Sequence, residues 1–268
     1  EMIDVGGLTL IRSAAKNYRD VAVIVDPSDY AEIIDEVKAT EGALSDATRF
    51  RLMKKAFKRI AHYDLAIAGF FDRFGKVSDA KQLSQFPQEI SLDFVKVQDL
   101  RYGENPHQRA AVYRDPTSRI CIAEAKQLAG KKGLSYTNIL DADAAYALIR
   151  ELKDDCATVI IKHTNPCGGA IGKTLAESYK KALATDPTSA FGGIYAFSRE
   201  VDEETAQAMS KQFIEVILAP GYSAEALRIL SKRENRRILD VTGLIKAEGE
   251  SSAAMKSFRS ILGGMLYQ

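Results

Sequence analysis

A lysine and a histidine stand side by side after an apolar run, and this pair is the part of the sequence best suited to chemistry. Lys162 and His163 directly follow the Thr-Val-Ile-Ile run at 158–161. An imidazole accepts a proton near neutral pH, and an ammonium group stabilises negative charge that develops on an oxygen. The pair therefore predicts proton transfer at a substrate atom beside a stabilised oxyanion, with a purely structural histidine as the competing interpretation.

The residues around the pair predict a strand that ends in a tight turn. The run 158–161 is β-branched and apolar on both faces, which is typical of a buried strand. Pro166 and Gly168-Gly169 predict a break in regular structure directly afterwards. Because ligands in open α/β sheets bind beyond the carboxyl ends of strands, we expect Lys162 and His163 to lie at such an end.

Helices are predicted where a capping residue precedes apolar residues at helical spacing. Thr174 and Glu177 have the spacing of a capping box, so we expect a helix from 174 to about 185. Ser45 can cap the longest helical pattern, 46–74. Further strands are expected at 21–25, 90–100, 120–124, 194–197, 213–218, 237–241 and 261–267.

Several other residues could contact an anionic, ring-bearing ligand. Arg101 and Tyr102 open a polar turn in which a guanidinium could bind phosphate and a ring could cover a base, although a solvated turn is the alternative. Asn138 is most simply a helix cap, with ligand contact as the other interpretation. Gly192 begins a strand where the backbone could approach a ligand, and Glu215 either faces outward or lies at a site.

Composition indicates a globular protein that acts on small molecules. The chain has 268 residues, of which 46% are hydrophobic and 27% charged, and a net charge of +1 does not favour nucleic acid or a membrane surface as partner. Three irregularly spaced cysteines and the lack of a secretory or transmembrane-length apolar run predict a cytoplasmic location.

Common cofactor motifs are missing from the sequence. Pro166-Cys167 resembles half of a zinc-deaminase motif, but Ala170 stands where its second cysteine is needed, so no metal site is expected. Neither a dinucleotide fingerprint nor a P-loop occurs. A Cys167 nucleophile with His163 as its base is a weaker alternative for the chemistry.

Five stretches match one family of enzymes in order along the chain. They are Ile3-Asp4-Val5-Gly6-Gly7 with Ala14-Ala15-Lys16-Asn17, Leu100-Arg101-Tyr102-Gly103-Glu104-Asn105-Pro106-His107-Gln108, Lys162-His163-Thr164-Asn165-Pro166-Cys167-Gly168, Ser189-Ala190-Phe191-Gly192-Gly193, and Leu218-Ala219-Pro220-Gly221-Tyr222. With these motifs the chain closely resembles the bifunctional AICAR formyltransferase/IMP cyclohydrolase family of purine biosynthesis.

The resemblance implies an α/β fold in two parts, within a longer protein. Residues 1–75 are expected to be the end of a methylglyoxal-synthase-like cyclohydrolase domain plus a helical connector. Residues 90–268 are expected to be the first cytidine-deaminase-like subdomain of the formyltransferase, a fold used there without a metal. The implied partners are the nucleotides AICAR, FAICAR and IMP, the co-substrate 10-formyltetrahydrofolate, and a second copy in a homodimer.

The resemblance also implies roles for residues in both parts. In the formyltransferase, His163 would accept the proton of the AICAR amine and Lys162 would stabilise the formyl oxyanion or help protonate the folate leaving nitrogen. The implied nucleotide contacts are Arg101, Tyr102, Asn138, Gly192 and Glu215, the last in a position that is usually Asp in the family. Asp4 and Lys16 would belong to the cyclohydrolase site. A non-catalytic nucleotide-binding or structural fragment is the alternative function.

Overall fold

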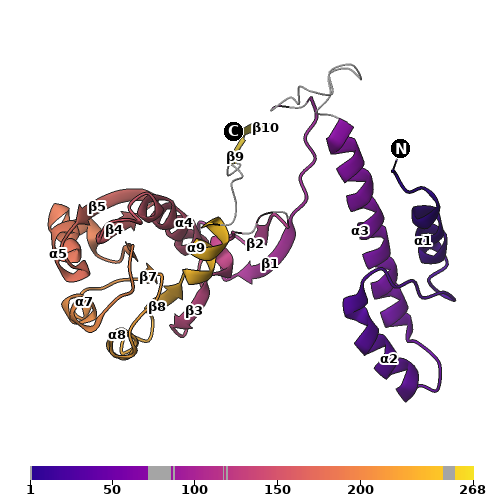
Figure 1. Ribbon diagram of the computed structural model, residues 1–268, viewed down its shortest axis with the longest axis horizontal. Coiled ribbons are helices and arrows are strands. Elements are labelled where there is room, and N and C mark those ends of the chain that lie inside the picture. Colours follow the sequence, from indigo (N-terminus) through magenta and orange to yellow (C-terminus); the bar gives the residue numbers. More distant parts are fainter. Residues whose placement is uncertain (1, 72–85, 87, 117, 119, 250–256) are drawn as a thin grey trace. The chain divides into compact units, whose positions relative to one another are not determined.

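The computed structural model describes residues 2–71, 86, 88–116, 118, 120–249 and 257–268, and it contains helices together with a mixed β-sheet. The chain divides into two compact units, Glu1–Asp93 and Phe94–Gln268 (Figure 1). This division lies close to residue 90, where the second domain was expected to begin. Which catalytic domain each unit represents stays a prediction.

The first unit is built from helices around a small core. Its elements are helix α1 (Gly6–Lys16), a 3₁₀ helix at Pro27–Asp29, α2 (Tyr30–Ala39) and the long α3 (Asp46–Phe71). Residues 21–25, expected as a strand, form no regular secondary structure and pair with no strand among the described residues of the unit, so that prediction was wrong. Strand propensity without a neighbouring ladder does not make a sheet.

A buried carboxylate joins α2 to α3 in this unit. Asp29 accepts hydrogen bonds from Lys55 Nζ (2.7 Å) and Arg51 Nη1 (2.8 Å), both on α3. The bond from Lys55, followed by the bond from Arg51, lowers the pKa of Asp29 from its ordinary value. Ile33 on α2 and Leu52 on α3 are buried in the same unit.

The second unit contains a six-stranded mixed sheet in the order β3-β8-β7-β6-β4-β5, with β6, β7 and β8 parallel and the other neighbours antiparallel. Its strands are β3 (Lys126–Ala129), β4 (Ala157–Lys162), β5 (Asn165–Ile171), β6 (Ile194–Phe197), β7 (Val216–Ala219) and β8 (Arg237–Asp240). Its helices are α4 (Tyr136–Arg150), α5 (Leu175–Thr185), α6 (Pro187–Ala190), α7 (Glu203–Met209), α8 (Ala224–Leu230) and α9 (Thr242–Gly249). Two hairpins complete the unit, β1 (Val95–Leu100) with β2 (Ala110–Arg114) and β9 (Phe258–Ile261) with β10 (Gly264–Tyr267).

Alternate side chains of β4, β6, β7 and β8 enter two separate hydrophobic cores, as the period of a strand requires. In β4, Ile160 packs toward α5, α7 and α8, whereas Val159 and Ile161 pack toward α4 and α9. The helices on both sides of the sheet in Figure 1 form the outer layers of this three-layer arrangement. The central strands are therefore apolar on both faces, which confirms the prediction for 158–161.

Two predictions for the second unit were wrong, and a third was correct only in part. Pro166 and Gly168-Gly169 do not break regular structure but lie in β5, which pairs with β4 through an irregular register near Ile161. Proline is tolerated there because β5 is an edge strand. Residues 120–124 hold a 3₁₀ helix at Ile122–Glu124 rather than a strand, and 261–267 belongs to a hairpin that turns at Gly263, where φ is +72°.

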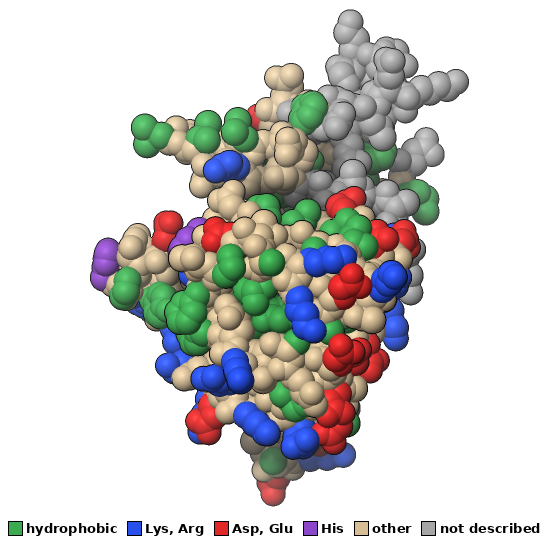
Figure 2. Space-filling model, turned by 90° about the vertical axis from the view of Figure 1, so that its left-hand side faces the viewer, with side chains coloured by type: hydrophobic (Ala, Val, Ile, Leu, Met, Phe, Trp, Pro, Cys, Tyr) green, Lys and Arg blue, Asp and Glu red, His purple; other side chains and the backbone are tan. Residues whose placement is uncertain are grey.

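Side chains of both charges are present on the surface. On the face seen in Figure 2, basic and acidic side chains lie among one another. Within the described residues, no helix combines the length and the apolarity that are needed to cross a bilayer.

Gly168 lets β5 approach α5, and this predicts a selective effect of added volume. A Cβ at Gly168 would lie 2.3 Å from the backbone oxygen of Ala182, whereas a Cβ at Gly169 would meet nothing within 4 Å. We expect Gly168→Ala to lower the free energy of unfolding by about 1–3 kcal/mol, because α5 must move away from the sheet. Gly169→Ala is the matched control and should change it little. Urea unfolding measures both, and equal stabilities of the two variants would contradict the packing argument.

Candidate functional site

The candidate residues of the second unit gather at one end of the sheet. Strand β4 runs antiparallel to β6, so the carboxyl end of β4 at Lys162 lies beside the amino end of β6 at Ile194. The pairing of Ile194 with Val216, and of Val216 with Arg237, brings the amino ends of β7 and β8 to the same place. Lys162 lies at the carboxyl end of β4, as expected, whereas the three parallel strands bring their amino ends to this place.

A cleft of about 240 Å³ opens at this end of the sheet. Its walls are formed by Arg101, Tyr102, Lys132, Phe213, Ile214, Glu215, Asn235 and Arg237. The cleft thus brings together three residues that the sequence singled out, since Arg101 and Tyr102 follow β1 and Glu215 precedes β7. The guanidinium of Arg101 also lies over the ring of Tyr102, 5.2 Å from its centroid.

Charge in the cleft is unevenly distributed. Arg237, whose side chain is only 6% exposed, pairs with Glu215 at 3.1 Å. Arg101 and Lys132 are exposed and have no carboxylate partner among the described residues. The cleft therefore presents two free cations, an arrangement that suits an anionic group such as phosphate.

Glu215 joins the cleft to helix α4. Its Oε2 accepts hydrogen bonds from Arg237 Nη1 and from Asn138 Nδ2, each at 3.1 Å. Asn138 also forms a capping box with Ser135. Its side-chain Oδ1 accepts a hydrogen bond from the backbone amide of Ser135, and its backbone amide donates to Ser135 Oγ, each at 3.2 Å. The N-cap is Ser135 and Asn138 is the N3 residue of the capping box, so the capping role predicted for Asn138 is correct only in part. The Asn138 side chain also binds Glu215.

Gly192 lies between the cleft and Lys162. Its φ of +72° is in the left-handed region, and a Cβ there would lie 3.2 Å from the ring of Phe213 and 3.7 Å from Lys162 Nζ. The Lys162 ammonium donates a hydrogen bond to the carbonyl of Phe191. The rings of Phe191 and Phe213 are 5.0 Å apart, so Lys162 ends beside an aromatic pair that is partly exposed.

His163 lies in the two-residue turn between β4 and β5. The expected order of strand, turn and helix was wrong, because β5 intervenes before α5. His163 is exposed, and its imidazole has no hydrogen-bond or ion-pair partner among the described residues. The ring is therefore free to meet a substrate at the end of the sheet.

Cys167 is poorly suited to act as the nucleophile. Its Sγ donates to the carbonyl of Ile160 at 3.6 Å, and burial raises the pKa of its thiol above the ordinary value. A thiol with a raised pKa is a weaker source of thiolate.

Within the described residues, no three His, Cys, Asp or Glu side chains are grouped to hold a metal ion.

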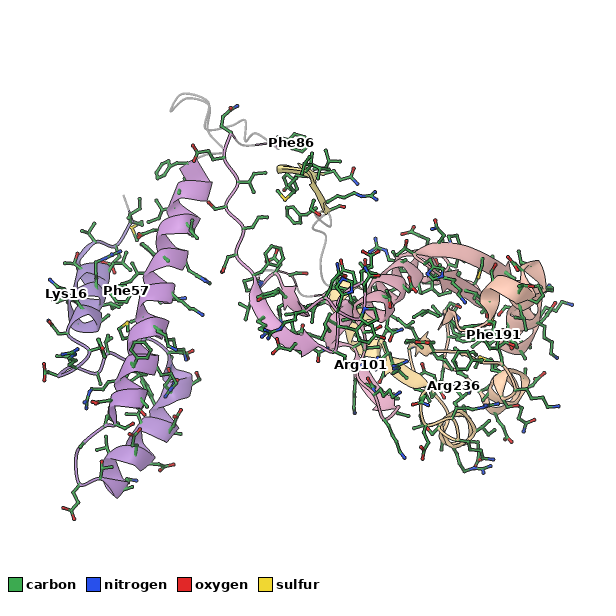
Figure 3. The ribbon with its side chains drawn as sticks, turned by 180° about the vertical axis from the view of Figure 1, so that it is seen from behind. Lys16, Phe57, Phe86, Arg101, Phe191 and Arg236 are labelled. Atoms are coloured by element: carbon green, nitrogen blue, oxygen red, sulfur yellow. The ribbon has the colours of Figure 1, made fainter. Side chains whose placement is uncertain are left out.

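Asp4 and Lys16 belong to the first unit. Asp4 Oδ1 accepts from the amide of Gly7 at 3.2 Å, at the start of α1, and the Asp4 amide donates to Tyr63 Oη at 2.8 Å. Lys16 is exposed in the last turn of α1, and Figure 3 marks it on this helix. No hydrogen bond or ion pair joins Asp4 to Lys16 among the described residues.

Sequence reasoning missed Lys132, Phe213, Asn235 and Arg237, which also line the cleft. Lys132 lies two residues after Gly130, which has a φ of +108°. A Cβ added at Gly130 would lie 2.8 Å from the backbone oxygen of Arg236. The basic, glycine-flanked composition of 130–133 was a usable signal for this contact. The signal for Arg237 was weaker, since it is only a charged residue at the start of a short apolar strand. Figure 3 marks Arg101, Phe191 and Arg236, which come from three separate segments of this unit.

Removing the Glu215 carboxylate should destabilise the unit, because it leaves the buried Arg237 guanidinium without a partner. We expect Glu215→Ala to lower the free energy of unfolding by about 1–3 kcal/mol. Glu225→Ala is the matched control, since Glu225 and Arg228 form an exposed pair at 2.7 Å, and such pairs contribute at most about 1 kcal/mol. Urea unfolding distinguishes the two, and equal losses would contradict the role assigned to Glu215.

Comparison with known proteins shows the family of this chain. The model of the family described as the AICARFT/IMPCHase bienzyme matches residues 14–268, which is nearly the whole chain. The match includes the Arg-Tyr turn, the Lys-His turn and the glycine-lined start of β6. The chain therefore belongs to the AICAR formyltransferase/IMP cyclohydrolase family, folate-dependent enzymes of purine biosynthesis.

Proposed function

We propose that the second unit binds AICAR in the cleft beside Tyr102 and supplies Lys162 and His163 for formyl transfer from 10-formyltetrahydrofolate. The observation that carries this proposal is the meeting of a cationic cleft with the Lys-His turn at one end of the sheet. The cleft accounts for an anionic, ring-bearing substrate, and the turn accounts for proton transfer.

The nucleotide contacts follow from the free charges of the cleft. Arg101 and Lys132 bind the phosphate, because neither is neutralised by a carboxylate among the described residues. Tyr102 and Phe213 supply apolar ring surface beside them. Glu215 uses Oε2 for both of its protein contacts, so Oε1 remains to accept from a hydroxyl or amide group of the nucleotide.

The transfer needs one base and one stabilised oxyanion. The 5-amino nitrogen of AICAR attacks the formyl carbon, and His163 takes the proton that this nitrogen loses. Lys162, the cation at the end of β4, stabilises the negative oxygen of the tetrahedral intermediate. As the carbonyl re-forms, the bond to the folate N10 nitrogen breaks and that nitrogen takes up a proton, which gives formylated AICAR and tetrahydrofolate.

The family match and the division of the chain into two units support an assignment of one activity to each unit. We assign residues 1–75 to the end of a methylglyoxal-synthase-like cyclohydrolase domain with its connector, and residues 90–268 to a cytidine-deaminase-like subdomain. Asp4 and Lys16 then serve the closure of formylated AICAR to IMP. The protein acts as a homodimer in the cytoplasm. Lys16 is exposed and has no ion-pair partner among the described residues, which supports a role in contacting a nucleotide.

A non-catalytic nucleotide-binding fragment is the second candidate function. Arg101 and Lys132 have no carboxylate partner in the described part of the chain, and these cations favour binding by themselves, whether or not chemistry follows. The two candidates differ only in what His163 and Lys162 contribute.

Replacing His163 separates the two candidates. We expect His163→Ala in the full-length protein to lower kcat for formyl transfer at least about a thousandfold, because the proton acceptor is lost, while AICAR affinity stays within about tenfold. Steady-state kinetics and calorimetry measure the two quantities. His62→Ala on α3 is the matched control and should keep the rate. A His163→Ala enzyme with an undiminished rate would leave only the binding candidate.

Arg101 tests the binding part of the proposal. In calorimetric titration of the 268-residue chain with AICAR, we expect Arg101→Ala to weaken binding by about 10–100-fold, the range for a charge-assisted hydrogen bond to phosphate. Arg109→Ala removes the same charge from an exposed position nearby and should stay within about twofold of the parent chain. Equal affinities of the two variants, or no binding by the parent chain, would contradict an AICAR site in this unit.

A further inference from the structure

The turn that carries His163 has an unfavourable backbone conformation. His163 and Thr164 have φ values of +55° and +62°, and Lys162 pairs with Asn165 on either side of them. A two-residue hairpin loop with both residues in the left-handed region is a type I′ turn, which strongly prefers Asn and Gly. A left-handed conformation is especially unfavourable for a β-branched residue such as Thr164. Other contacts must therefore maintain this turn.

One long-range contact holds the turn. The Thr164 amide donates to Asp141 Oδ1 at 2.7 Å, across 23 residues of sequence. The other polar contacts are local, since Thr164 Oγ1 and Asn165 Nδ2 both donate to the His163 carbonyl, at 2.7 and 2.9 Å. Among the described residues, only the bond to Asp141 anchors the turn to a separate element, helix α4.

The same helix also holds the cleft. Asn138 donates to Glu215 in the cleft, and Asp141 stands three residues further along α4. Residues at this spacing lie on one face of a helix, so one face of α4 contacts both the cleft and the His163 turn. A shift of either side chain would change the distance between the bound nucleotide and the imidazole.

We propose that Asp141 is a positioning residue, which keeps the His163-Thr164 turn in its left-handed conformation and so places the His163 imidazole. The carboxylate accepts a charge-assisted hydrogen bond from the Thr164 amide, which compensates for the unfavourable φ of that residue. Without it, the turn relaxes and the imidazole samples positions away from the substrate amine. Asp141 itself needs no contact with the substrate.

Substitutions at Asp141 and Thr164 test the proposal in the full-length protein. We expect Asp141→Ala to lower kcat about 10–100-fold with the KM for AICAR within about threefold, because misplacement of a catalytic group affects the transition state most. Asp141→Asn keeps an oxygen acceptor and should retain most of the rate. The double variant Asp141→Ala/Thr164→Gly should recover at least about fivefold over Asp141→Ala, because glycine adopts positive φ without strain.

A matched control separates positioning from a general loss of stability. Asp202 accepts from the Thr205 amide at 2.8 Å at the start of α7, a bond of the same kind away from the site. Asp202→Ala should lower the unfolding midpoint about as much as Asp141→Ala and leave kcat unchanged. An Asp141→Ala enzyme with full kcat, or a double variant without recovery, would overturn the proposal.

The kinetic test rests on the proposed role of His163, so a second measurement is made on the backbone itself. Amide hydrogen exchange at Thr164 should become at least about tenfold faster in Asp141→Ala, because its acceptor is lost and the turn opens. Unchanged exchange at Thr164 would overturn the inference whatever the kinetics show. If His163→Ala keeps its rate while Asp141→Ala speeds this exchange, the proposed function fails and Asp141 still holds the turn.

Discussion

The antiparallel pairing of β4 with β6 is the interaction on which the candidate site depends. Because β4 runs against its parallel neighbours, its carboxyl end meets the amino ends of β6, β7 and β8. Lys162 thereby lies beside Gly192, although thirty residues of sequence separate them. In a sheet with all strands parallel, the same residues would lie at opposite ends. The mixed topology is therefore what lets one short segment serve both the Lys-His turn and the cleft.

The segment 212–215 connects these parts through backbone contacts. The Gly192 amide donates to the carbonyl of Phe213 at 2.8 Å, and the Glu215 amide donates to that of Gly193 at 3.2 Å. On its other side, the Arg237 amide donates to the Glu215 carbonyl at 3.0 Å. The segment thus continues the sheet beyond the end of β7, and it holds its aromatic and acidic side chains at fixed positions. A site built on such a ladder requires little reorganisation when a ligand binds.

The elements that local chemistry determines could be predicted from the sequence, whereas the edges of the sheet could not. Neighbouring residues in the sequence determine the strand before Lys162 and the helix cap at Thr174, and both predictions were confirmed. The assignment of Pro166 to a break failed, because its tolerance in β5 depends on the edge position of that strand. Arg237 was missed in the site for a similar reason, since its partner Glu215 lies on a different strand segment. Local signals identify residue types that suit a ligand, but only strand order decides which of them meet.

Arg236 and Arg237 illustrate how much polarity this end of the sheet must hold. Successive residues of a strand point to opposite faces, so Arg237 reaches Glu215 while Arg236 enters the core beside Tyr179 and Tyr195. Burial lowers the pKa of the Arg236 guanidinium to about 10, which leaves it charged at neutral pH. Its Nη2 donates to the carbonyl of Gln212 at 2.7 Å, but Nε and Nη1 have no partner among the described residues. A buried cation with unsatisfied donors destabilises a core, so the compensating effect must come from what it fixes. Both arginines bind the segment 212–215 from opposite faces of the sheet, and this is the segment that supplies Phe213 and Glu215 to the cleft.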